Sequence, residues 1–161
     1  MIETGATRLE MEELDIGEVA RQVAEELEPR ARERKIAVAV EVPRGLPVRA
    51  DRRRIEQVLT NLLDNAVKFN REAGAVQVRG EKKDGRVVLR VEDTGPGIPA
   101  QDLEQVFHRF YRIDKARSRE LGGTGLGLSI VKHLARLHGG TVHAENRPEG
   151  GASFVVELPA A

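Results

Sequence analysis

The sequence predicts an α+β fold: a two-layer α/β sandwich in which three main helices cover one face of a mixed, mostly antiparallel sheet. Two observations predict it. Apolar residues recur at helical spacing in three separate segments, and strand-like segments come mostly in pairs joined by short turns. Because strands joined by hairpins run antiparallel, a doubly wound parallel sheet is disfavoured.

The first helix is predicted to begin at Asp15, which can cap it, with Glu18 three residues later completing a capping box. The charged residues 30–35 are expected to form its solvated end. A strand with alternating β-branched residues follows over residues 36–42, and residues 44–50 turn back with room for a short strand. The apolar face of this helix is formed by Ile16, Val19, Ala20, Val23 and Leu27.

The second helix is predicted to start after the cap Asp51, and the third over residues 128–138, where a glycine cluster opens it and Gly139 follows it. A long, mostly polar stretch is expected over residues 100–121. The buried face of the second helix is predicted to consist of Ile55, Val58, Leu59, Leu62, Leu63 and Ala66. Two hairpins are expected from strands at residues 75–81, 86–92, 141–145 and 152–158.

Composition narrows the classes of function. The chain has 161 residues, 26 basic and 26 acidic side chains, and no cysteine. The absence of cysteine excludes disulfide scaffolds, Cys-rich zinc modules and thiol nucleophiles. The balanced charge argues against a nucleic-acid partner bound by bulk charge, and no apolar run is long enough to cross a membrane. We therefore expect one globular domain with a cytoplasmic location.

The second helix carries a polar stripe beside its buried face. Asn61, Asn65 and Lys68 fall within one narrow stripe at 100° per residue. An asparagine oxygen suits Mg²⁺, and lysine supplies a point charge for phosphate. The alternative is that each asparagine faces solvent or bonds nearby backbone. Three polar residues in register weigh against it, because asparagine is a poor helix former.

Two glycine clusters flank the densest group of aromatic residues. In residues 93–98, a carboxylate at a strand end can accept from an exocyclic amine, although a plain turn in which Asp93 binds its own loop amides is the alternative. Residues 122–127 directly precede a predicted helix, and glycine-rich backbone at the start of a helix can bind an anion. The alternative is a flexible hinge. The sequence has no Gly-Lys-Ser/Thr, so this segment is not a P-loop. Phe107, Phe110 and Tyr111 either plug the core or anchor a movable lid.

These segments, in this order, resemble the ATP-binding catalytic domain of sensor histidine kinases, in the superfamily that includes gyrase, Hsp90 and MutL ATPases. Residues 61–69 are similar to the family's N box, 93–98 to its G1 box, 107–111 to its F box and 123–128 to its G2 box. The resemblance implies the two-layer Bergerat fold, which agrees with the order of elements derived above.

The resemblance also implies ATP and Mg²⁺ as ligands. Asn65 would coordinate the metal, Lys68 would meet a phosphate, and Asp93 would accept the adenine amino group. Ser153 would add a water-mediated purine contact. The implied ATP-binding residues are Asn61, Asn65, Lys68, Phe69, Asp93, Gly95, Gly97, Ile98, Phe110, Tyr111, Gly123, Thr124, Gly125, Leu126, Gly127, Leu128 and Ser153, with Asn61, Asn65 and Lys68 as the catalytic set.

The phosphate acceptor is not implied by this chain. None of its four histidines precedes an acidic residue, as the family's acceptor does. Residues 1–14 resemble the end of a dimerisation hairpin with a linker, so residues 15–161 are expected to be the catalytic domain of a longer kinase. The implied partners are that kinase's dimerisation/phosphoacceptor domain and a response regulator. We expect the fragment to be monomeric, and any membrane anchor of its parent to lie in N-terminal parts that are missing here.

Two other functions remain open at this point. One is a nucleotide-binding module that regulates by conformation alone, and the other is a protein-serine kinase of the anti-sigma type, which shares these boxes. Hydrolysing relatives carry a glutamate where Asn61 stands, and an amide cannot take a proton from water. We therefore expect slow ATP hydrolysis.

Overall fold

The computed structural model describes residues 8–108 and 127–161. Its helices and strands follow the predicted order, with a strand added before the first helix and two short 3₁₀ helices added in the long polar stretch. In chain order they are β1 (Met11–Asp15), α1 (Ile16–Glu33), β2 (Ala37–Glu41), β3 (Pro47–Asp51), α2 (Arg52–Lys68), β4 (Ala75–Lys83), β5 (Arg86–Asp93), the 3₁₀ helices η2 (Ala100–Asp102) and η3 (Gln105–Phe107), α4 (Gly127–Leu137), β6 (Thr141–Asn146) and β7 (Ala152–Pro159).

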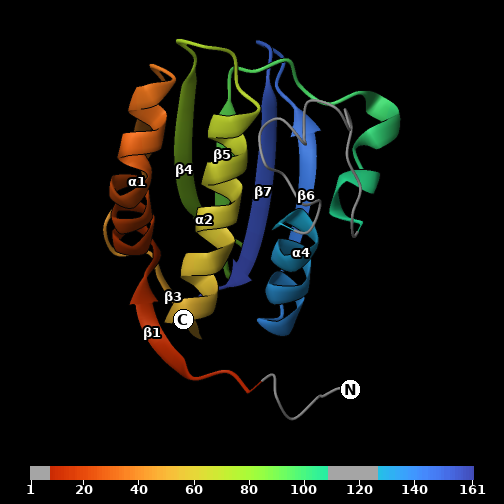
Figure 1. Ribbon diagram of the computed structural model, residues 1–161. Helices are drawn as coiled ribbons and strands as arrows, with labels where there is room; N and C mark the ends of the chain where they lie inside the picture. Colours follow the sequence, from red (N-terminus) through yellow and green to blue (C-terminus); the bar gives the residue numbers. More distant parts are fainter. Residues whose placement is uncertain (1–7, 109–126) are drawn as a thin grey trace.

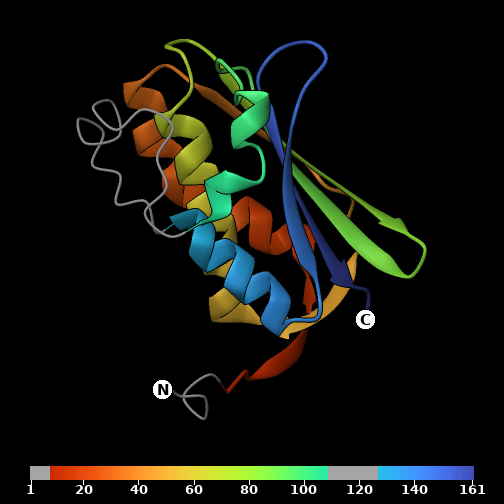
Figure 2. The ribbon, with the colours of Figure 1, turned by 90° about the vertical axis from the view of Figure 1, so that its right-hand side faces the viewer.

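The fold has two layers. One layer is a five-stranded sheet of order β2-β4-β5-β7-β6. The β2–β4 pair is parallel, and the other three pairs are antiparallel. The helices α1, α2 and α4 lie side by side over one face of this sheet, and the other face is left open (Figures 1 and 2). The predicted two-layer sandwich is confirmed.

Helix α2 lies at the centre of the helical layer, between α1 and α4 (Figure 1). Its six predicted apolar residues are all buried, and Val67 joins them. From the sheet, alternate residues of β5 and β7 pack against the helices, since Leu89 stands opposite Val156 and Val91 opposite Phe154. The ring of Phe107 meets that of Phe154 edge to face, with centroids 6.0 Å apart, so Phe107 belongs to the core.

Both predicted helix caps are present. The Oδ1 atom of Asp51 accepts a hydrogen bond from the backbone N–H of Arg54 at 3.2 Å. The Oδ1 atom of Asp15 accepts from the N–H of Gly17 at 3.0 Å, rather than from Glu18 as a capping box requires. Each carboxylate therefore satisfies a backbone donor that the first turn of the helix leaves free.

Strand β1 overlaps residues 1–14, which were expected to be a linker and the end of a dimerisation hairpin and in which no strand was predicted. It pairs antiparallel with β3 in a separate two-stranded sheet, with Leu14 opposite Val48. Leu14 and Val48 are both buried, but the rest of β1 is exposed or half-buried. Because only one side chain of β1 faces the core, the sequence shows no alternation there, and the strand depends on β3 as its partner.

The long polar stretch and the helices of the described residues remain to be compared with the predictions. Residues 100–107, expected as loop, include η2 and η3. None of the helices in the described ranges has both the length and the apolar character that a bilayer crossing requires.

Candidate nucleotide-binding site

The polar stripe of α2 divides into paired and unpaired side chains. The Nδ2 atom of Asn61 donates to the carbonyl of Gly127, the first residue of α4, at 3.2 Å. Lys68 Nζ lies 3.3 Å from Asp64 Oδ2, and Asp64 Oδ1 lies 2.6 Å from Arg30 Nη1 of α1. Within the described part of the chain, the Asn65 side chain makes no hydrogen bond. Its amide oxygen is therefore available to a ligand.

This arrangement fits a magnesium ion held mainly by a ligand's phosphates. Mg²⁺ prefers hard oxygen ligands and commonly takes one or two from the protein, with the remainder from phosphates and water. The half-buried Asn65 offers such an oxygen. No group of three or more His, Asp or Glu side chains among residues 8–108 and 127–161 is placed to hold a metal by itself.

Asp93 ends β5 with one carboxylate oxygen occupied. Its Oδ1 atom accepts from the backbone N–H groups of Gly95 at 2.9 Å and Ala152 at 3.2 Å. No hydrogen bond involves Oδ2 in the described residues. Burial raises the pKa of Asp93, and although these two N–H groups and the charge of Arg147 oppose the shift, the pKa stays above its ordinary value. The loop thus orients Asp93 and leaves Oδ2 as an acceptor.

The loop after Asp93 is held by Asn146, the last residue of β6. Asn146 Oδ1 accepts from the N–H of Ile98 at 2.8 Å, and its Nδ2 donates to the carbonyl of Ile98 at 2.6 Å. Gly97 lies beside this amide with φ of +79°, and a Cβ atom there would be 2.8 Å from Asn146 Oδ1. A side chain at Gly97 would therefore displace the amide that fixes the loop.

A buried polar network joins the end of α2 to the same loop. Asn70 has no exposed surface; its Nδ2 donates to the carbonyl of Ala75 at 3.0 Å, and its Oδ1 accepts from Thr94 Oγ1 at 3.3 Å. Thr94 Oγ1 also accepts from the N–H of Ala75 at 2.8 Å. A Cβ atom on Gly95 would lie 3.0 Å from the carbonyl of Phe69, so the two predicted boxes meet closely.

Arg34 of the predicted solvated run has a structural role instead. Its guanidinium donates to three carbonyls at the C-terminal end of α2: Val67, Lys68 at 2.6 Å and Asn70 at 2.6 Å. Carbonyls in the last turn of a helix lack partners within the helix. Arg34 satisfies them and so fixes the residues that follow Asn65.

Ser153 lies in β7, on the last hairpin, and its side chain faces away from the helices. It stands opposite Glu92 in the β5–β7 register. Successive strand residues face opposite sides of the sheet, so Ser153 points away from the helices, whereas its neighbours Ala152 and Phe154 face them. Its hydroxyl is buried without a hydrogen bond in the described structure. The residue of β7 that bonds directly to Asp93 is Ala152, through its backbone N–H, and the purine contact of Ser153 stays a prediction.

The other predicted site residues fall into two groups. Phe69 caps the end of α2, Ile98 is buried, and Gly127 and Leu128 begin α4. Outside the described residues lie Phe110, Tyr111, Gly123, Thr124, Gly125 and Leu126, with the rest of the predicted lid.

Sequence reasoning missed Asn70, Asn146, Arg147 and Arg34. Each of these side chains binds backbone groups, mostly of residues distant in sequence. Asparagine and arginine between regular elements look like ordinary turn or surface residues, so local patterns carry little signal for such roles. The best signal is the polar Asn70 directly after the N box.

Comparisons with known proteins agree with this geometry. Residues 50–161 match the family described as histidine kinase-, DNA gyrase B-, and HSP90-like ATPase. The chain is 35% identical over 156 residues to the sensor-like histidine kinase SenX3 of Mycolicibacterium smegmatis, covering 96% of this chain and 41% of SenX3. The chain thus spans less than half of that relative's length.

Solved structures give the same result. The catalytic domain of histidine kinase ThkA, in a nucleotide-free form, has a TM-score of 0.83 at 35% identity, covering 94% of this chain and 96% of that one. Full-length ShkA in complex with AMPPNP has a TM-score of 0.85 at 40% identity, covering 97% of this chain and 32% of ShkA. The chain therefore belongs to the histidine kinase-, DNA gyrase B- and HSP90-like ATPases, and within them to the ATP-binding catalytic domains of histidine kinases.

Proposed function

We propose that this domain binds ATP with Mg²⁺ and donates the γ-phosphoryl group to a histidine on a separate dimerisation domain, as part of two-component signalling. The observation that carries the proposal is that two side-chain oxygens, one on α2 and one at the end of β5, have no hydrogen-bond partner within the described residues. Asn65 offers one from α2, and Asp93 offers the other from the end of β5. The amide oxygen of Asn65 suits a magnesium ion bound to phosphates, and the carboxylate oxygen of Asp93 suits the amino group of adenine.

Each residue would contribute by position or charge, which is most of what phosphoryl transfer requires of a protein. Asn65 would hold Mg²⁺ through its amide oxygen, and bound Mg²⁺ neutralises charge on the phosphates. Lys68 would turn from Asp64 to a phosphate oxygen, and Arg30 would then keep Asp64 neutralised. Asp93 Oδ2 would accept from the adenine amino group. The imidazole nucleophile would come from the other domain.

Asn61 favours transfer over hydrolysis. Its Nδ2 atom donates to the carbonyl of Gly127, so the side chain is used to connect α2 with α4. An amide cannot act as a general base for water. We propose that ATP is hydrolysed slowly until an acceptor domain docks.

The proposed partners follow from the family. Histidine kinase ThkA has been solved in complex with response regulator protein TrrA, and that kinase resembles this chain at 32% identity with a TM-score of 0.78. We propose a response regulator as the downstream partner. We further propose that residues 15–161 form a catalytic domain that is monomeric by itself and works in the cytoplasm, and that residues 1–14 lead from the dimerisation domain.

A transfer assay tests the function. The chain is mixed with the separately prepared dimerisation domain of its parent kinase and ATP labelled at the γ-phosphate. The expected product is an acid-labile phosphohistidine on that domain, formed only with Mg²⁺. A dimerisation domain with its acceptor histidine changed to glutamine is the matched control. An acid-stable product would indicate a serine kinase, and ATP binding without transfer would indicate a module that regulates by conformation.

A further inference from the structure

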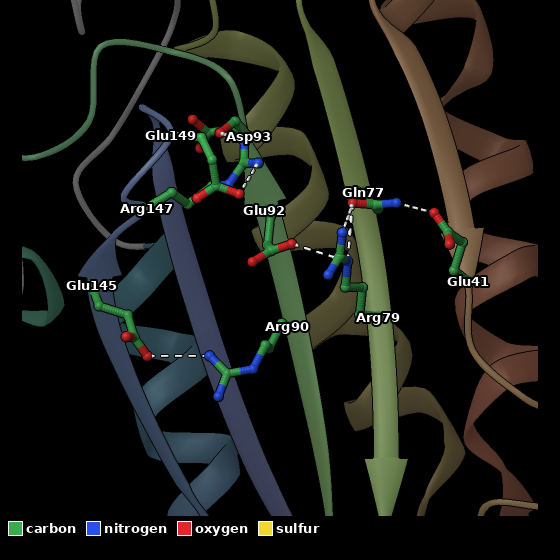
Figure 3. Close-up of polar contacts among 9 residues, drawn as sticks. All are labelled: Glu41, Gln77, Arg79, Arg90, Glu92, Asp93, Glu145, Arg147 and Glu149. Atoms are coloured by element: carbon green, nitrogen blue, oxygen red, sulfur yellow. Dashed lines mark hydrogen bonds and ion pairs between the residues drawn. The ribbon is translucent and has the colours of Figure 1, made fainter.

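Arg147 lies in the turn between β6 and β7, directly after Asn146, and its side chain reaches the end of β5. Figure 3 shows it beside Asp93 and Glu149. Its Nη1 atom donates to the backbone carbonyl of Asp93 at 3.0 Å, and only 16% of the side chain is exposed. Its backbone N–H closes the turn by donating to the carbonyl of Gly151 at 2.9 Å. The guanidinium is therefore held between its own turn and the end of β5.

The end of the β6–β7 turn, at Gly151 and Ala152, also contacts Asp93. Gly151 has φ of +92°, and a Cβ atom there would lie 1.9 Å from the carbonyl oxygen of Asp93. No side chain fits between the two strands at this point. The next residue, Ala152, donates its N–H to Asp93 Oδ1. The β6–β7 turn thus binds the backbone carbonyl of Asp93 through Arg147 and its carboxylate through the N–H of Ala152.

Charge matters as much as position here. A carboxylate accepts hydrogen bonds through both oxygens, whereas a protonated carboxyl carries a donor on one of them. An adenine amino group is itself a donor, and Oδ1 already accepts from two N–H groups, so Oδ2 is the better acceptor for it when the carboxyl is ionised. Burial raises the pKa of Asp93, and the charge of Arg147 opposes that shift.

The other charged groups near Asp93 are already paired. Glu149, which is mostly exposed, lies 3.4 Å from Arg147 Nη2. Glu92 precedes Asp93 on the opposite face of β5 and pairs with Arg79 of β4 at 3.3 Å. Lys68, at the end of the α2 helix that packs against this loop, pairs with Asp64. Arg147 is therefore the cation that acts on Asp93 directly within the described residues.

We propose that Arg147 is a positioning residue of the nucleotide site: its bond to the backbone carbonyl of Asp93 and its positive charge keep the Asp93 carboxylate in place as the acceptor for the adenine amino group. This inference rests on the proposed function, in which Asp93 recognises adenine. It assigns part of the selectivity for adenine to a residue that itself does not touch the base.

The test compares Arg147→Met, Arg147→Lys and Glu149→Gln by calorimetric titration between pH 8 and pH 5. The ligands are a non-hydrolysable ATP analogue, the matching GTP analogue and inorganic triphosphate, all with Mg²⁺. Arg147→Met should weaken the ATP analogue about tenfold at pH 8, the size of one charge-assisted hydrogen bond. The loss should grow as the pH falls, with the affinity for triphosphate unchanged. Arg147→Lys keeps the positive charge but loses the planar guanidinium. Its affinity for the ATP analogue should therefore lie between those of Arg147→Met and the unchanged chain.

Glu149→Gln should bind as the unchanged chain does, because it leaves the contact of Arg147 with Asp93 in place. Equal losses for the ATP analogue and triphosphate, or a loss that does not vary with pH, would overturn the role of Arg147. Should Arg147→Met fail to fold, the pH profile of Arg147→Lys decides by the same criteria. Asp93→Asn separates the two proposals: if it binds the ATP analogue normally, adenine recognition by Asp93 fails, whatever Arg147 does.

Discussion

His138 Nε2 accepts a hydrogen bond from the backbone N–H of Asp51 at 3.1 Å, although the two residues are 87 positions apart. The Nδ1 atom of His138 lies 2.8 Å from the carbonyl of Leu134, which can only accept, so Nδ1 is the donor of this ring and Nε2 is its acceptor. Both residues are buried. Asp51 also caps α2 and accepts from the N–H of Glu10 through Oδ2. This pair joins the end of α4 to the start of α2 and to the chain before β1.

The first prediction concerns this pair. His138→Ala should lower the free energy of unfolding by about 1–3 kcal/mol, because it leaves the buried N–H of Asp51 without an acceptor. Denaturant unfolding followed by circular dichroism measures the change. His133 is an exposed histidine of α4, and His133→Ala should change the free energy of unfolding by no more than about 0.5 kcal/mol. Equal effects of the two substitutions would show that the bond contributes nothing.

A second prediction concerns Arg34, which binds the carbonyls at the C-terminal end of α2. Arg34→Met should lower the free energy of unfolding by about 1.5–3 kcal/mol, since a charged donor to three helix-end carbonyls is lost. Arg32→Met is the matched control, because Arg32 pairs with Glu28 on the surface of the same helix, and such pairs contribute about 0–1 kcal/mol. If both variants lose the same stability, Arg34 is an ordinary surface residue.

The metal role of Asn65 gives a third prediction. Asn65→Ala should abolish the Mg²⁺-dependent part of the affinity for an ATP analogue, because it removes the free amide oxygen of α2 while leaving the buried face intact. Calorimetric titration with and without Mg²⁺ measures this part, and thermal unfolding checks the fold. Glu56→Gln, on the same helix, should bind as the unchanged chain does. An affinity that Mg²⁺ still increases in Asn65→Ala would refute the role.

Asp93→Asn gives a fourth prediction, with opposite effects on binding and stability. It should weaken the ATP analogue far more than free triphosphate, because an amide nitrogen in place of Oδ2 cannot accept from adenine. The pKa of Asp93 is raised by burial, so the native state holds this proton more tightly than the unfolded state does. The contribution of Asp93 to stability is therefore most favourable below the unfolded pKa and is lost as the pH rises through the folded pKa.

The amide introduced by Asp93→Asn has no such titration, so this variant should unfold no more easily than the unchanged chain at pH 7. Its stability should also vary less with pH above the ordinary carboxyl range. Urea unfolding at several pH values measures both effects. A variant less stable at pH 7 would show that the ionised carboxylate favours the fold, against the direction of its pKa shift.

Local elements were predictable because their causes lie within a few residues. The caps of α1 and α2, the buried face of α2 and the strands of both hairpins each depend on neighbours one or two turns away. Strand β1 was not predictable, because Leu14 is its only buried residue and its partner β3 lies far along the chain. The face of the sheet on which Ser153 lies depends on the register of β7 against β5, and the sequence of β7 does not specify that register by itself.

By itself, the sequence determined the fold class, the order of the elements and the segments that carry the polar residues of the site, since hydrophobic period and turn chemistry are local properties. Only the tertiary structure decided how those segments are held. Arg34, Asn146 and Arg147 act on backbone groups more than 30 residues away. Such bonds form where folding brings distant carbonyls and N–H groups beside a side chain, and no local pattern records which of them will meet.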